Sequence, residues 1–264
     1  MSRLRQYLKR TRLYRSSFFL RYIKESLAIP FRRRSFAEYG EDLIVESLLG
    51  KAVEFFIDVG ANDGFHCSNT FYFALRGAGG VCFEPIPEVY SSLRSLHALN
   101  HKVKCLRCGL SDENKNARMV SLEGLSYLAE TQDLSHKLLH QAEHPIAPEV
   151  REICLFRFQD AIAGLDVPRI VDLLTVDVEG HELKVLQSIP FDLYQFRVII
   201  VETHQLDADS QYLWQHRDYE EIFGLLESRG YRPAQRTAAN TIFVNESMMP
   251  SNREPLLAAT HPSL

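Results

Sequence analysis

The 264-residue sequence predicts an α/β protein with a mostly parallel sheet and helices on both faces. Two observations favour this fold. Short apolar runs typical of buried strands alternate with amphipathic helical patterns from Glu54 onward. Several of these runs end in acidic or small polar residues, as expected at the edge of a parallel sheet that binds ligands.

The predicted elements follow one another in a regular order. We expect strands at 55–59, 80–83, 103–110, 153–158, 170–176 and 197–201, and a closing antiparallel pair at 231–236 and 241–244. We expect helices at 38–49, 68–75, 87–100, 181–189 and 219–228, and a short helix that ends near residue 165. Residues 112–150 interrupt this alternation. Because a structureless loop of this length is unusual, we interpret them as an inserted cap.

Charge and polarity divide the chain into three parts. Residues 1–34 contain eleven Lys and Arg residues and one acid, Glu25, so the other residues together carry −14 although the whole chain carries only −4. We interpret residues 1–35 as a basic amphipathic extension that lies on an anionic membrane surface or on a partner; the alternative is a solvated or poorly ordered extension. Residues 36–245 form the main domain, and residues 246–264 are a polar tail.

Composition argues against several classes of protein. The acidic main domain disfavours nucleic acid as a partner. Five scattered cysteines do not form a secreted disulfide framework, and no apolar run reaches the roughly 18–20 residues of a membrane span. We therefore expect a cytoplasmic protein, with peripheral membrane contact through residues 1–34 as the alternative to a purely soluble one. The sequence does not determine the oligomeric state.

The segment FIDVGANDG, residues 56–64, is the most informative motif. An apolar strand breaks into Asp58, Gly60, Asn62 and Gly64, so the backbone can approach a ligand closely before the next helix begins. The loop lacks the third glycine of a dinucleotide-binding fingerprint, and its carboxylates would repel a pyrophosphate. A cationic nucleoside such as S-adenosylmethionine fits these charges better.

The other predicted strands also end in chemically active residues. Glu84 follows the second strand and can accept hydrogen bonds from both ribose hydroxyls of a nucleoside, although it can also cap the next helix. The later strands end at Ser111 and Asp112, at Asp177 through His181, and at Glu202 through His204. Since parallel strands end at one edge of a sheet, we expect these side chains to gather there.

These blocks together resemble a known family. FIDVGANDG, Ser68-Asn69-Thr70, FEPIPEVYSSL, LLTVDVEGHELKVL and VIIVETH occur in the order found in the FkbM family of S-adenosylmethionine-dependent methyltransferases. YGEDLI (39–44) and NTIFV (240–244) extend the similarity to residues 36–245. The resemblance implies a class I methyltransferase (Rossmann-like) fold with a seven-stranded sheet, and methyl transfer to a hydroxyl of a sugar, glycan or related natural product.

The resemblance also implies residue roles. Asp58, Gly60, Asn62 and Gly64 would bind the methionine end of S-adenosylmethionine, and Glu84 would hold the ribose. Ser111 and Asp112 would lie near the adenine. Asp177 and Glu179 would face the methyl group, and we count Asp177 among the cofactor-binding residues.

The acceptor must lose a proton, and a positioned histidine or carboxylate can take it. We predict His181 and Glu179 as the catalytic pair, with Glu202 as a further carboxylate candidate; a structural role for the pair is the alternative. Asp177, Glu179, Glu202 and His204 together would suit a divalent ion, but their spacing is not diagnostic, so we assign no metal ligands.

Two other functions remain open at this stage. An NAD-type oxidoreductase would use a related sheet, and the acidic loop with two glycines argues against it. A non-catalytic cofactor-binding protein, with the basic N-terminus as its working part, is the other.

Overall fold

The computed structural model describes residues 12–28, 35–121, 126–129, 149–206, 212–215 and 217–249. Seven strands form its main sheet, in the order β12, β13, β9, β8, β1, β2, β3. Their bounds are Tyr231–Arg236 (β12), Asn240–Asn245 (β13), Gln195–Glu202 (β9), Ile170–Val176 (β8), Phe55–Val59 (β1), Gly79–Phe83 (β2) and Val103–Leu106 (β3).

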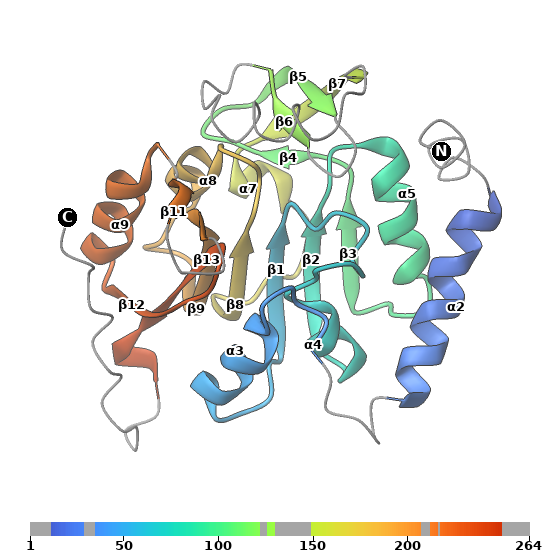
Figure 1. The fold of residues 1–264 in the computed structure, drawn as a ribbon, viewed down its shortest axis with the longest axis horizontal. Coiled ribbons are helices and arrows are strands. Elements are labelled where there is room, and N and C mark those ends of the chain that lie inside the picture. Colours follow the sequence, from blue (N-terminus) through green and yellow to red (C-terminus); the bar gives the residue numbers. More distant parts are fainter. Residues whose placement is uncertain are drawn as a thin grey trace.

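The strands from β9 to β3 run parallel to one another, whereas β13 is antiparallel to both β9 and β12. In register, Ile57 of β1 lies opposite Val81 of β2 and Leu174 of β8. The carboxyl ends of the parallel strands therefore share one edge, at the top of Figure 1. This arrangement confirms the predicted seven-stranded, mostly parallel sheet.

Helices cover both faces of this sheet, as predicted. One face packs against α7 (Phe158–Ala161), α8 (Glu182–Ser188) and α9 (Tyr219–Ser228). The other packs against α3 (Glu41–Leu49), α4 (Phe71–Leu75), α5 (Pro87–Leu96) and α2 (Arg12–Ala28). In β1, Phe56 belongs to the second core, and Ile57 and Val59 belong to the first. Alternate side chains of a strand point to opposite faces, so a sheet covered on both sides needs a continuous apolar run.

A second sheet of four strands lies over the carboxyl edge of the first (Figure 1). It consists of β4 (Gly109–Leu110), β7 (Glu149–Phe156), β5 (Lys115–Ser121) and β6 (Ser126–Leu128), in that order. The described parts of the predicted insertion, 112–121 and 126–129, belong mostly to this sheet. Its strands β5 and β7 pair antiparallel along seven residues each.

Two strand predictions are wrong in this region. The expected strand 103–110 is broken, because β3 ends at Leu106 and residues 109–110 pair with β7 instead. The expected strand 153–158 begins earlier, at Glu149, and lies in the second sheet. In β7, buried positions alternate with exposed ones toward its end, as expected for a sheet with one solvated face. A short antiparallel pair, β10 (His204–Leu206) and β11 (Tyr212–Gln215), was not predicted.

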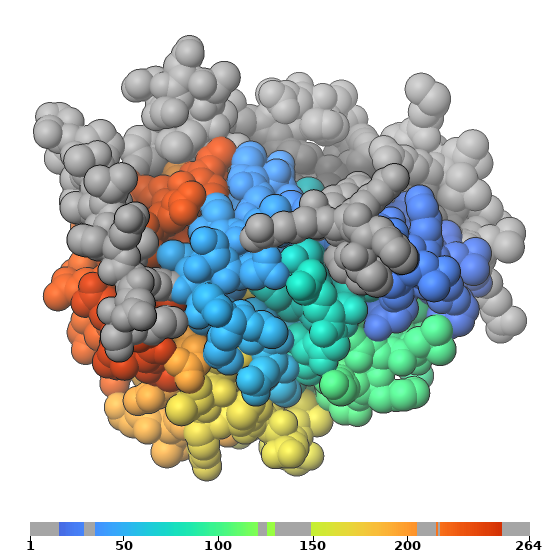
Figure 2. Space-filling view, turned by 90° about the horizontal axis from the view of Figure 1, so that it is seen from below, coloured from blue at the N-terminus to red at the C-terminus, as the bar shows by residue number. Residues whose placement is uncertain are grey.

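The described part of the basic extension is helix α2. It lies beside α5 in Figure 1, and Figure 2 shows it in dark blue next to the green segment near residue 100. Phe18 is fully buried in the core formed with α3, α4 and α5, and Tyr22 packs edge-on against Phe71 and His97. One face of α2 therefore belongs to the domain itself. Among the described residues, no helix has the length and hydropathy that a membrane span requires.

Candidate active site

A cavity of about 460 Å³ lies at the carboxyl edge of the main sheet, beneath the second sheet. This volume is within the range of roughly 300–1,000 Å³ typical of small-molecule sites. Seven of the predicted site residues line it: Asp58, Gly60, Asn62, Glu84, Asp177, Glu179 and His181. The other four, which lie outside its lining, are Gly64, Ser111, Asp112 and Glu202.

The loop after β1 is pressed against the neighbouring strands. The backbone N–H groups of Gly60 and Ala61 both donate to the carbonyl of Phe83, at 3.1 and 3.0 Å. Gly60 has a φ of 87°, and a Cβ atom added there would lie 1.7 Å from the carbonyl oxygen of Asp177. Only glycine fits this position, because both the conformation and the space exclude a side chain.

Gly64 has a structural role in this loop. Its φ is 77°, and an added Cβ would lie 2.5 Å from a methyl group of Leu93 on α5. The second glycine of the motif thus lets α5 pack closely against the loop. Its predicted contact with the methionine end of the cofactor stays a prediction.

Asp58 lies at the end of β1, where its carboxylate accepts a hydrogen bond of 2.6 Å from the Thr70 hydroxyl. Burial raises the pKa of Asp58 to about 6, although the Thr70 hydrogen bond opposes the shift. Thr70 belongs to the Ser68-Asn69-Thr70 block, and the Asn69 amide donates to the hydroxyl of Thr175 on β8. This block therefore ties β1 to β8 at the wall of the cavity.

Glu84 is buried at the end of β2 and lines the cavity. One of its oxygens accepts the backbone N–H of Ile86 at 2.7 Å, which fixes the side chain in the turn before α5. Burial raises the pKa of Glu84 to about 7, against the effect of backbone hydrogen bonds from Ile86 and Asn62. A carboxylate fixed in this way can still accept hydrogen bonds from a ribose.

The acids after β8 and β9 form a tight cluster. Glu202 is buried and shares a hydrogen bond with Asp177, which is exposed to the cavity. Removal from bulk water, followed by repulsion from neighbouring carboxylates, raises the pKa of Asp177 to about 7 and that of Glu202 well above its usual value.

Glu179 extends this cluster into the cavity from a strained turn. Its φ is 58°, in the left-handed region that residues other than glycine rarely adopt, and Gly180 follows with a φ of 98°. Burial and the charge of Asp177 raise the pKa of Glu179 well above its usual range. Backbone strain of this kind is often retained where it aims a functional side chain.

The sequence-based prediction missed Glu182, which holds this turn in place. Its fully buried carboxylate accepts the backbone N–H groups of Val178, at 2.8 Å, and Gly180, at 3.0 Å. An acidic residue in the first turn of α8 was the available signal, since such residues satisfy free N–H groups next to a helix start.

Ser111 and Asp112 lie against His181. The Ser111 hydroxyl is 2.9 Å from Asp112 Oδ1 and 3.0 Å from Nε2 of His181, and Asp112 also accepts an ion-pair hydrogen bond of 2.9 Å from Lys184. Ser111 is completely buried. These contacts connect Ser111 and Asp112 to a predicted catalytic residue, and their placement near adenine remains a prediction.

Three carboxylates have the arrangement that a cation needs. Single oxygens of Asp177, Glu182 and Glu202 lie within 4.8 Å of one another. His204 hydrogen bonds to Thr203 and to the carbonyl of Thr237, and it is absent from this group. Glu182 already accepts the backbone N–H groups of Val178 and Gly180.

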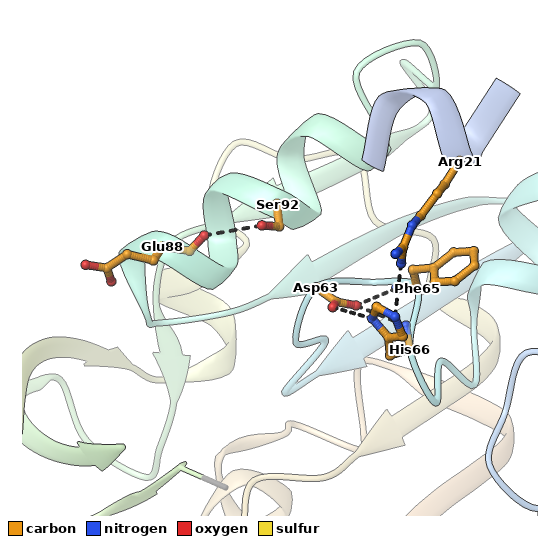
Figure 3. Close-up of polar contacts among 6 residues, drawn as sticks. All are labelled: Arg21, Asp63, Phe65, His66, Glu88 and Ser92. Carbon is orange, nitrogen blue, oxygen red and sulfur yellow. Dashed lines mark hydrogen bonds and ion pairs between the residues drawn. The ribbon is translucent and has the colours of Figure 1, made fainter. Parts of the chain in front are cut away.

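The basic extension contributes an unexpected neighbour to the cavity. Figure 3 shows Arg21 of α2 reaching His66, whose ring also contacts Asp63. Both His66 and Asp63 line the cavity. Nothing in the spacing of the basic residues singled out Arg21, because the contact joins segments 45 positions apart.

Comparison with protein families identifies the family of the chain that carries this site. Residues 58–233 match the methyltransferase FkbM domain. The chain belongs to this family. It is therefore an S-adenosylmethionine-dependent methyltransferase, and the alternative of an NAD-type oxidoreductase is discarded. An acidic cavity lined by Asp58, Glu84 and Asp177 suits a cofactor that carries a sulfonium and an ammonium group.

Solved structures of other methyltransferases are similar to this FkbM protein. An O-methyltransferase from Bacillus cereus in complex with S-adenosylhomocysteine is 12% identical, with a TM-score of 0.43 over 86% of this chain and 89% of that one. Magnesium protoporphyrin IX methyltransferase from Synechocystis, with bound S-adenosylmethionine, is 12% identical, with a TM-score of 0.38 over 77% and 76%. Precorrin-6y C5,15-methyltransferase from Geobacter metallireducens is 10% identical, with a TM-score of 0.39 over 80% and 91%. Comparison with curated proteins gives no significant match.

Proposed function

We propose that this FkbM protein is an O-methyltransferase that acts on a hydroxyl group of a sugar, glycan or related natural product. The observation that carries the proposal is that Glu179 and His181 line the same cavity as the cofactor-binding residues Asp58 and Glu84. Two groups able to accept a hydroxyl proton are thus placed beside the methyl donor's site.

The hydrogen bonds around His181 support its role as the base. The Ser111 hydroxyl gives its only hydrogen to Asp112, so Nε2 of His181 carries a hydrogen and donates it to Ser111. In a neutral imidazole, Nδ1 is then the basic nitrogen. Lys184 fixes Asp112 in turn, which makes a chain of contacts that orients the ring, as in other base-and-orienter pairs.

Bound S-adenosylmethionine supplies an activated methyl group whose transfer needs an in-line approach of the acceptor oxygen. The chain's own residues align the two partners and accept the proton. In the proposed arrangement, the Gly60 loop and the Glu84 carboxylate hold the donor from one side of the cavity, and Glu179 and His181 face the acceptor.

The far wall of the cavity is consistent with a neutral, hydroxyl-rich acceptor. Arg151 on β7 lies 2.5 Å from a Glu149 oxygen and 3.4 Å from a Glu88 oxygen, and all three line the cavity. Their formal charges sum to −1, so this wall does not favour an anionic acceptor. It offers hydrogen-bond donors and acceptors for hydroxyl groups.

The test uses S-adenosylmethionine with a tritiated methyl group and glycans or glycolipids extracted from cells. We expect label in an alkali-stable ether. We expect His181→Ala to lower turnover about 100-fold or more, with S-adenosylhomocysteine affinity within about twofold of wild type. His101→Ala, which changes an exposed histidine outside the cavity lining, is the matched control. Label confined to protein or nucleic acid, or unchanged turnover in His181→Ala, would refute the proposal.

We also propose that α2 gives the protein peripheral contact with an anionic membrane surface. Leu20 is 62% exposed and Leu27 is 71% exposed, and helical geometry puts both on the side of α2 opposite the buried Phe18. Exposed leucines on a strongly basic segment favour such contact. Flotation with anionic vesicles should recover the wild type, and Leu20→Ser with Leu27→Ser should reduce recovery several-fold. Leu99→Ser, at a leucine that is 52% exposed elsewhere, should not. Recovery that is equal on zwitterionic vesicles would contradict the proposal.

A further inference from the structure

Helix α2 reaches the loop after β1 through one side chain, Arg21. The Nη1 atom of Arg21 lies 3.0 Å from Nε2 of His66. The same guanidinium stacks over two aromatic rings, 4.7 Å from the centroid of Phe65 and 5.0 Å from that of Phe18. Figure 3 shows this side chain descending from α2 to the histidine ring.

These contacts determine which nitrogen of His66 carries the hydrogen. A guanidinium has only donors, so Nε2 of His66 must accept the hydrogen bond from Arg21. The ring hydrogen is then on Nδ1, which lies 2.7 Å from Oδ2 of Asp63 and donates to it. The histidine is therefore held as a single tautomer between a cation and a carboxylate.

Asp63 passes this constraint to the backbone of the loop. Its Oδ1 atom accepts the N–H groups of Phe65 and His66, both at 3.0 Å. Burial alone would raise the pKa of Asp63, but the hydrogen bonds from His66 hold this pKa below its usual value. Asp63 and His66 line the cavity next to Asn62, so this loop forms part of its wall.

The position of α2 does not depend on this contact. Phe18 is fully buried in the core, and Tyr22 packs against Phe71 and His97. Arg21 can therefore be changed while its helix stays docked. The contact adds little to the attachment of α2, but it acts directly on the wall of the cavity.

We propose that Arg21 is a positioning residue for S-adenosylmethionine binding. The hydrogen bond that Arg21 donates fixes His66 as the Nδ1–H tautomer. This tautomer in turn holds residues 63–66 in the conformation that the cofactor requires. The N-terminal helix is thus a part of the cofactor site. The proposal rests on the family's reaction and is independent of the acceptor and of any membrane contact.

The test compares Arg21→Ala and Arg21→Lys in the full chain, with Lys24→Ala as a matched control. Lys24 is an exposed cation on the same helix and is outside the cavity lining. Calorimetry with S-adenosylhomocysteine should show about tenfold weaker binding in Arg21→Ala, as expected for the loss of one charge-assisted hydrogen bond. Arg21→Lys should recover part of the affinity, and Lys24→Ala should bind like the wild type.

A second measurement separates positioning from a general loss of structure. Nitrogen-15 NMR of the histidine rings should show the Nδ1–H tautomer of His66 in the wild type and in Lys24→Ala, and a mixture of tautomers in Arg21→Ala. Circular dichroism checks that α2 remains folded. An Nε2–H tautomer in the wild type would overturn the proposal even if Arg21→Ala fails to fold. So would equal weakening in Lys24→Ala, or unchanged affinity in a folded Arg21→Ala variant. None of these measurements involves an acceptor, so the proposed O-methylation can fail independently.

Discussion

Replacing Gly60 by alanine tests whether close contact between β1 and β8 builds the cofactor site. The new Cβ would lie 1.7 Å from the carbonyl oxygen of Asp177 and 2.8 Å from its carbon, so the loop or the end of β8 must move. The left-handed backbone at Gly60 costs another residue about 1–2 kcal/mol, and relieving the overlap costs about 1–3 kcal/mol more. We therefore expect the free energy of unfolding to fall by about 2–5 kcal/mol, a large part of the roughly 5–15 kcal/mol typical of a domain.

Gly164 provides the matched control for this prediction. Its φ of 81° is similar to the 87° of Gly60, but an added Cβ would have no atom within 4 Å. Gly164→Ala thus has the backbone strain without the overlap. Guanidinium unfolding should show a difference of about 1–3 kcal/mol between the two variants. Calorimetry should show at least tenfold weaker S-adenosylhomocysteine binding in Gly60→Ala alone, because a displacement of about 1 Å can disable a site. Equal destabilisation in both variants, or wild-type affinity in Gly60→Ala, would refute the reasoning.

Two further predictions concern the acids of the cavity. Because burial raises the pKa of Glu84 to about 7, the carboxylate that we expect to accept the ribose hydroxyls is the minor form at pH 6 and the major form at pH 8. Calorimetry should show S-adenosylhomocysteine affinity rising about tenfold over this range, with a flatter profile in Glu84→Gln; an equal slope in the variant would count against the assignment. The stability of the unliganded protein depends on pH in the opposite direction. Glu84 binds its proton more tightly in the folded state, so its contribution to the free energy of unfolding is lost as the pH rises through about 7. Burial and neighbouring carboxylates raise the pKa of Glu202 well above its usual value, which disfavours the ionised form that a cation would bind. We therefore expect methyl transfer to survive treatment with a strong chelator. A loss of activity that Mg²⁺ or Mn²⁺ restores would show that the carboxylate group holds an ion.

Sequence patterns predicted the main sheet well because its central strands are buried on both faces. Such strands are continuous apolar runs, and the predicted bounds of β8, Ile170–Val176, match the structure. Helix α9 also has its predicted bounds, Tyr219–Ser228, since it is amphipathic and closed by Gly230. The second sheet was not recognised. Its strands have one solvated face and pair across chain segments whose separation carries no local signal.

The candidate site divides in the same way. Local motifs placed Asp58, Glu84 and Asp177 at strand ends, and parallel topology was enough to bring them to one cavity. The role of Ser111 was not visible from its own neighbours, because its contact with His181 joins residues 70 positions apart. Glu182 was overlooked although it lies within a quoted motif, since its task is to satisfy N–H groups of a turn whose shape the sequence does not reveal.

By itself, the sequence determined the family, the cofactor and the sheet edge at which most of the predicted site residues gather, because glycines, acidic strand ends and apolar runs are local properties of the chain. Only the tertiary structure decided how those parts act on one another. It brought Glu202 next to Asp177, connected His181 to Ser111, and brought Arg21 of the N-terminal helix onto His66. Hydrogen bonds and burial depend on distances in space, and packing sets those distances after the local elements have formed.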